Sequence, residues 1–96
     1  SEEVIVPYVS PIDGRKHRYF VDIWMKNRKG GVYLIEIKPA AQSQPPKKKS
    51  RVTKKYLNEV KTWGVNQAKW VAATAYCQER GWTFKVITEK DLFKYK

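Results

Sequence analysis

Two apolar stretches joined by a short polar turn decide the fold of this chain. Residues 19–25 read YFVDIWM and residues 32–38 read VYLIEIK, and the segment Asn27-Arg-Lys-Gly-Gly31 between them has the composition of a tight turn. Both stretches are rich in β-branched and aromatic side chains, which predicts two neighbouring strands. Each stretch carries one acid among apolar neighbours, Asp22 in the first and Glu36 in the second.

These two acids are candidates for a metal site. A carboxylate inside an apolar strand is costly unless it is paired or bound to a cation. Side chains alternate along a strand, so Glu36 and Lys38 share a face, and Asp22 comes opposite one of them if the strands are neighbours. Two carboxylates and the backbone carbonyl of Ile37 suit Mg²⁺ or Mn²⁺, and the lysine could orient a water or stabilise charge during phosphodiester hydrolysis. The alternative is a half-exposed Asp22 that pairs with Arg18 or Lys38.

Working outward, the upstream half of the chain has the period of strands. Glu3–Val9 predicts a first strand, and Pro11-Ile-Asp-Gly14 predicts the turn that leads to a second strand over His17–Lys26. Val32–Lys38 is the third. Three strands joined by two tight turns predict an antiparallel meander.

The downstream half changes to helical spacing. Thr53–Thr62 predicts a helix that ends at Trp63-Gly64, and a second helix is expected from an N-cap at Asn66 to a stop at Gly81. Trp82–Thr88 alternates and predicts a fourth strand, followed by a short helix over residues 88–93. The order βββααβα predicts an α/β (α+β) fold, in which helices flank a mixed β-sheet.

Composition limits the class of protein. The length of 96 residues predicts one domain over residues 1–96, and 20 Lys and Arg against 9 Asp and Glu give a net charge of +11. Such an excess favours nucleic acid as the partner. Cys77 is the single cysteine, which excludes an intrachain disulfide and a cysteine-cluster zinc site. The longest nearly apolar stretch, residues 71–77, is too short to span a membrane, so we expect a soluble, intracellular protein without a membrane partner.

A basic, proline-rich segment interrupts the pattern at residues 39–52. Its three prolines and lack of apolar period predict a mobile loop of polyproline character. The basic residues here and just beyond are expected to contact phosphates without reading sequence; they are Lys47, Lys48, Lys49, Arg51, Lys54 and Lys55. The alternatives are a merely solvated loop or a mimic of a nuclear localisation signal.

The four tryptophans are expected mainly in the core. They are Trp24, Trp63, Trp70 and Trp82. Trp63, beside the glycine of the expected helix break, is the best candidate for an exposed ring that stacks on a nucleobase.

The same residues resemble a known group of nucleases. Asp22 followed by Glu36-Ile-Lys38 resembles the motif of the PD-(D/E)XK superfamily. Residues 19–24, 33–39 and 81–89 are similar to its TnsA-type transposon-end endonuclease branch. Longer strings resemble the head completion nucleases of large contractile-tailed phages; they are residues 2–8, 56–70 and 82–89. The resemblance covers essentially the whole chain.

This resemblance implies a restriction-endonuclease-like core and Mg²⁺- or Mn²⁺-dependent cleavage of double-stranded DNA, largely independent of sequence. It implies catalytic roles for Asp22, Glu36 and Lys38, with Asp22, Glu36 and the Ile37 carbonyl as metal ligands. The implied task is the processing of DNA ends after packaging and before tail joining. That task implies contacts with portal or neck proteins and a place in the host cytoplasm or on the virion.

Gln67 and Lys69 resemble accessory residues that orient phosphates in some related nucleases. The alternative is an ordinary solvated helix start, because helix N-termini are commonly polar.

The chain departs from the superfamily pattern in two ways. The superfamily places an acid on a helix before the first core strand, whereas this sequence opens on that strand, and Glu2 and Glu3 do not suit the role. Val21 also stands where the motif has proline. Either a longer polypeptide supplies the acid, or the chain is an inactive DNA-binding or structural head or neck protein that retains the fold. A basic RNA-binding module is disfavoured by the absence of an RRM-type motif.

Overall fold

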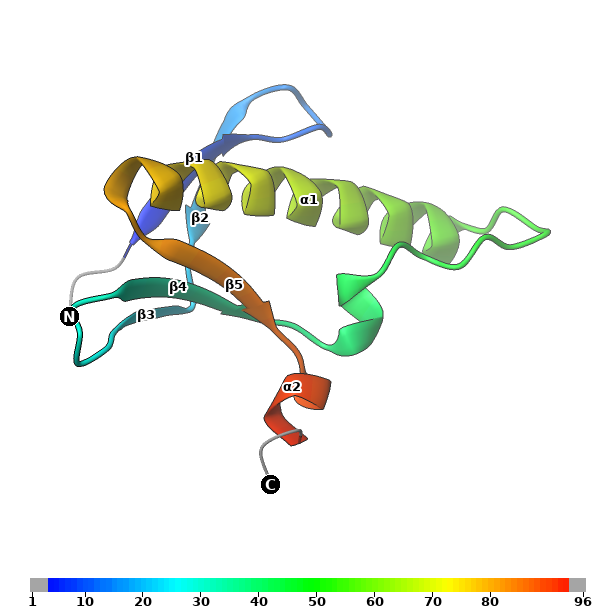
Figure 1. Cartoon of the computed structure of the whole chain (residues 1–96). Helices are drawn as coiled ribbons and strands as arrows, with labels where there is room; N and C mark the ends of the chain where they lie inside the picture. Colours follow the sequence, from blue (N-terminus) through cyan, green and yellow to red (C-terminus); the bar gives the residue numbers. More distant parts are fainter. Residues whose placement is uncertain (1–3, 94–96) are drawn as a thin grey trace.

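Five strands in two small sheets and one long helix dominate residues 4–93, the part of the chain that the computed structural model describes (Figure 1). The elements are β1 (Ile5–Val9), β2 (Lys16–Phe20), β3 (Ile23–Lys26), β4 (Val32–Ile37), the 3₁₀ turn η1 (Ala40–Ser43), α1 (Lys54–Arg80), β5 (Thr83–Ile87) and α2 (Glu89–Phe93). β1 and β2 pair antiparallel in one sheet, while β4 pairs antiparallel with β3 and parallel with β5 in the other. The predicted α+β class with a mixed sheet is confirmed, as are the last strand and the short final helix.

The expected strand over His17–Lys26 is broken in two, which corrects the predicted meander. The Val21 N–H donates to the Val4 carbonyl at 3.2 Å and extends the β1–β2 ladder, after which β3 pairs with β4 instead. The bend at Val21 and Asp22 turns the chain from one sheet into the other, so four strands in two hairpins precede the helix. Glu3, at the start of the first expected strand, lies outside the described residues.

The two predicted helices are one continuous helix, α1, of 27 residues. The Thr53 hydroxyl accepts the Tyr56 N–H at 3.1 Å at its start, and Gly81 ends it at φ 70°, the expected stop. Asn66 is therefore no N-cap but a buried residue inside the helix. A glycine such as Gly64 costs a helix interior only about 1 kcal/mol. Packing of α1 against both β1 and β5 offsets that cost, because burial of a helix face is the main source of helix stability in proteins.

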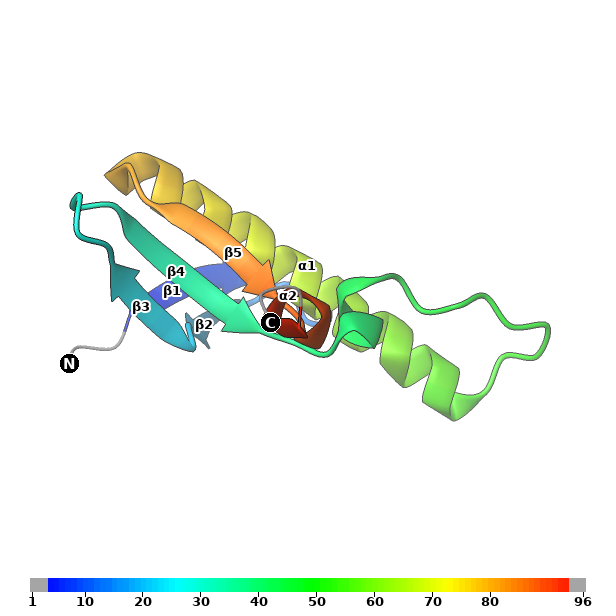
Figure 2. The same ribbon diagram turned by 60° about the horizontal axis from the view of Figure 1, so that its bottom comes forward.

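α1 joins the two sheets, since it crosses β5 and also packs against β1 (Figures 1 and 2). Val6, Tyr8 and Tyr19 from the β1–β2 hairpin meet Ala73 of α1 in the core. Other fully buried side chains include Leu34 in β4 and Cys77 in α1, and the latter confirms its expected core position. The core prediction is wrong for Trp24, which lies on the edge strand β3 and is 48% exposed. Trp63, Trp70 and Trp82 are partly buried.

The segment at residues 39–52 is not wholly irregular, because it opens with η1. The Ala40 N–H donates to the Glu89 carboxylate of α2 at 2.9 Å, which fixes this turn at the end of the mixed sheet. Residues 47–53 have no helix or strand, and they extend beyond the sheet to the start of α1 (Figure 2). Among residues 4–93, no helix is long and apolar enough to cross a membrane.

Candidate functional site

Asp22, Glu36 and Lys38 converge at the end of β4. Ile23 pairs with Ile35, so the same register carries Asp22 next to Glu36. The Ile37 N–H donates to Asp22 Oδ2 at 3.1 Å, and Lys38 Nζ lies 3.6 Å from Glu36 Oε1. Within residues 4–93, Asp22 forms no ion pair with Arg18 or Lys38. The structure thus places the three side chains together, while their catalytic and metal-binding roles stay predictions.

Glu36 is the buried carboxylate of this cluster. The residue is only 5% exposed, and its buried Oε2 accepts no hydrogen bond from any described residue. Burial and the neighbouring Asp22 carboxylate raise the pKa of Glu36 from 4.5 to about 7, against the opposing effect of Lys38. Buried polar atoms normally have partners, so a carboxylate oxygen left without one is a position where a cation would be stabilising.

Tyr19 completes the cluster from the other sheet. The residue is 3% exposed, and its buried hydroxyl has no hydrogen-bond partner among the described residues. Burial raises the pKa of Tyr19, and the negative charges of Glu36 and Asp22 raise it further, so the phenol stays neutral beside the carboxylates. Tyr19 is not among the site residues predicted from the sequence. In a straight strand, residues three apart face opposite sides, and only the bend at residues 21–22 lets Tyr19 and Asp22 approach the same carboxylate.

The donors fit a hard divalent cation. The N–H and C=O of one strand residue point toward the same neighbouring strand. Since the Ile37 N–H meets Asp22, the Ile37 carbonyl also faces Asp22, and two carboxylates with one carbonyl form an oxygen set of the kind that Mg²⁺ and Mn²⁺ prefer. Residues 4–93 contain no group of three or more His, Cys, Asp or Glu side chains able to hold a metal.

The two expected accessory residues, Gln67 and Lys69, point away from α1 in different directions. Lys69 Nζ lies 5.5 Å from the centre of the Tyr19 ring and 5.9 Å from that of Tyr8, so Lys69 borders the carboxylate cluster. Gln67 instead lines a cleft with Trp63. Residues two apart on a helix point in nearly opposite directions, which explains the divergence.

The basic residues expected to bind DNA are not part of the cluster. All of them are exposed, either on the segment that extends beyond the sheet or on the first turn of α1 (Figure 2). They are Lys47, Lys48, Lys49, Arg51, Lys54 and Lys55.

Comparison with known proteins assigns the chain to a class. The family model described as "TnsA-like endonuclease N terminal" matches residues 1–89, so the chain belongs to this family, which confirms the resemblance seen in the sequence. The chain is also similar to a particular protein, the head completion nuclease of Enterobacteria phage T4, with 44% identity over 96 residues. The match covers 96% of this chain and 64% of the relative, so the chain spans slightly less than two thirds of that protein's length. No solved structure matches the chain.

Proposed function

We propose that this chain forms the catalytic core of a metal-dependent DNA endonuclease of phage head completion, which processes DNA ends after packaging and before tail joining. The observation that carries the proposal is the buried, unpartnered oxygen of Glu36 beside Asp22 and Lys38. Membership of a family of endonuclease domains supports the reaction, and the name of the T4 relative supports the task. The corresponding place of action is the infected host cytoplasm or the virion, at the portal or neck of the head.

Each member of the cluster has a chemical role in this proposal. Asp22, Glu36 and the Ile37 carbonyl would hold Mg²⁺ or Mn²⁺, which supplies a Lewis acid and lowers the pKa of a bound water. The Lys38 amine, 3.6 Å from Glu36, would orient the attacking water and stabilise charge as the new P–O bond forms and the bond to the leaving oxygen breaks. The Tyr19 hydroxyl, which has no hydrogen-bond partner among the described residues, would be free to donate to Glu36 and orient it when the metal is bound.

The positive charge of the chain supports DNA as the substrate. A net charge of +11 and the basic residues over 47–55 favour contact with the phosphates of double-stranded DNA. These contacts would carry no base readout, so binding would be largely independent of sequence and strongly weakened by salt.

The test is cleavage of supercoiled plasmid by the full-length polypeptide with Mg²⁺, with Mn²⁺ or with EDTA. We expect nicking with either metal and none with EDTA. Glu36→Gln should abolish nicking and preserve DNA binding in a gel shift. Glu79→Gln is the matched control, since the Glu79 side chain is 79% exposed and lies on α1 away from the cluster. Failure of the wild-type protein to cut any form of DNA, or cleavage by Glu36→Gln at the wild-type rate, would refute the proposal.

A second candidate is a DNA-binding or structural head or neck protein that has lost catalysis. The observation that favours it is the presence of only two carboxylates in the cluster, with no third acidic, histidine or cysteine ligand within residues 4–93. This candidate predicts a salt-dependent gel shift without cleavage, unchanged by Asp22→Asn.

A further inference from the structure

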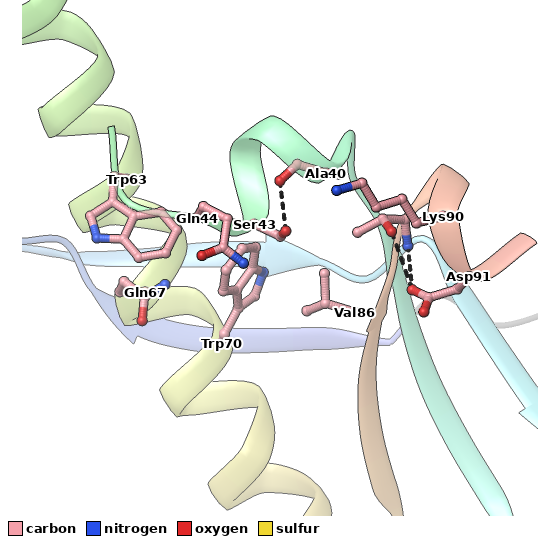
Figure 3. A pocket seen from close by; sticks show the side chains of 10 residues that line it. Ala40, Ser43, Gln44, Trp63, Gln67, Trp70, Val86, Lys90 and Asp91 are labelled. Atoms are coloured by element: carbon pink, nitrogen blue, oxygen red, sulfur yellow. Dashed lines mark hydrogen bonds between the residues drawn. The ribbon is translucent and has the colours of Figure 1, made fainter. Parts of the chain in front are cut away.

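A cleft of about 640 Å³ lies between η1, α1 and the end of β5 (Figure 3). Val86 lines this cleft and is the register partner of Glu36 on the parallel strand pair. Register partners share one face of a sheet and lie about 5 Å apart, so the cleft begins one strand away from the carboxylates. Its volume is typical of sites that hold small organic groups.

Two indole rings line the cleft and provide its aromatic surface. Trp63 and Trp70 lie seven residues apart on α1, and their ring centres are 6.2 Å apart at an angle of 88°. The Trp70 Nε1–H is buried and donates to no described residue. The side-chain amides of Gln44 and Gln67 lie beside the rings, one from the segment after η1 and one from α1 (Figure 3). Aromatic faces with neighbouring amide donors and acceptors are the surfaces that bind unstacked nucleobases.

A lysine at the rim of the cleft provides a positive charge for the phosphate attached to a bound base. Lys90 of α2 extends along one side toward η1 (Figure 3). Asp91 also lines the cleft, but its Oδ2 accepts the Thr88 N–H at 2.9 Å and the Thr88 hydroxyl at 3.3 Å, so this carboxylate is held against the end of β5. Lysine at the rim and aromatic rings inside match a nucleotide, whose base is flat and whose phosphate is negative.

We propose that this cleft receives an unpaired nucleobase of the DNA strand whose backbone crosses Asp22 and Glu36. The inference rests on the proposed nuclease function and narrows its substrate to DNA that has an unpaired base next to the scissile phosphate. A paired base can enter only after it is unstacked, which is costly, whereas an overhang or a frayed end presents such a base freely. The chain would therefore favour strand ends and single-stranded overhangs over continuous duplex.

The test is a scan of a duplex with a single-stranded overhang, in which one overhang base at a time is replaced by an abasic sugar. Affinity is measured in EDTA, so that the strand stays intact. For the wild-type protein, removal of the base at one position should weaken binding about tenfold, as expected for the loss of one base stacked on an aromatic ring. Trp63→Leu should bind every abasic overhang equally. Trp82→Leu removes an indole at the opposite end of β5 and should keep the wild-type dependence.

The outcomes separate this inference from the proposed function. Equal binding of all abasic overhangs by the wild-type protein, or a position dependence that persists in Trp63→Leu, overturns the base cleft. If the same protein nicks plasmid, the nuclease proposal then stands. A protein that binds no DNA at all overturns both. A melting curve establishes that Trp63→Leu is folded, and Gln67→Leu replaces it if it is not.

Discussion

Replacement of Glu36 by glutamine should stabilise the metal-free protein, although it removes a residue proposed to be essential. The folded-state pKa of Glu36 is raised from 4.5 to about 7. The folded protein therefore holds a proton that the unfolded chain releases, so its stability decreases as the pH rises from about 4.5 to about 7. At roughly 1.4 kcal/mol per pH unit, the ionised side chain costs up to about 3.5 kcal/mol.

Glutamine keeps the shape of Glu36 and carries no charge. Its amide needs hydrogen bonds of its own, so the expected gain at about pH 8 is roughly 1 to 3 kcal/mol, or a rise in Tm of several degrees for a domain of this size. Near pH 4.5 the two proteins should converge, because the wild-type carboxyl is then protonated in the folded state. Saturating Mg²⁺ should reverse the order at the higher pH, since ligand binding stabilises only the protein that binds it.

The assay is urea or thermal denaturation of the wild type, Glu36→Gln and Glu79→Gln at both pH values, with EDTA or Mg²⁺. Glu79→Gln should follow the wild type under all conditions, because Glu79 is exposed. A Glu36→Gln protein that is less stable than the wild type in EDTA at about pH 8 would refute the reasoning, since a buried and unsatisfied charge could not then be the dominant cost at this position.

Three other perturbations probe separate parts of the site. Tyr19→Phe should reduce single-turnover nicking about tenfold and raise the Mg²⁺ concentration needed for it, because Glu36 would lose the hydroxyl proposed to orient it. Tyr8→Phe, in the same core, should change neither. Replacement of residues 47–49 by glutamine should lower the slope of log affinity against log salt by up to about 3, while the cleavage rate at saturating DNA stays constant. An unchanged slope would exclude this segment from phosphate contact. The apparent affinity for Mg²⁺, measured by protection against thermal unfolding, should fall as the pH decreases below about 7, because the Glu36 carboxyl must lose its proton to bind a metal. An affinity that does not change with pH would exclude Glu36 as a ligand.

The convergence of Asp22, Glu36 and Lys38 could be predicted from the sequence because it depends on local rules. Alternation along a strand and a short turn are sufficient to bring an acid in one strand beside an acid in the next. The bend at residues 21–22 could not be predicted in this way. Except for Asp22 and Met25, every residue from 19 to 25 is a good strand former. The break is set by where β1 begins and β4 ends, which is tertiary information. The position of Tyr19 depended on that bend and was missed with it.

The continuity of helix α1 could not be predicted from local sequence either. Trp63-Gly64 followed by Asn66 has the local composition of a helix break, yet packing against β1 and β5 carries α1 through it. The predicted break separated Trp63 from the helix that holds Gln67 and Trp70. Once the helix is continuous, these three residues occur at positions i, i+4 and i+7 on one face, and the cleft that they line can be recognised.

The link between the two sheets has a consequence for when the proposed nuclease could act. The β3–β4 register alone brings Asp22 beside Glu36, whereas Tyr19 belongs to the β1–β2 sheet. The cluster is therefore complete only after β1 has packed on α1 and β5 has paired with β4. The lysines near the start of α1 that are proposed to contact phosphates would need no such assembly to attract DNA. A newly synthesised or partly unfolded chain would therefore bind DNA before it could cut it at the full rate.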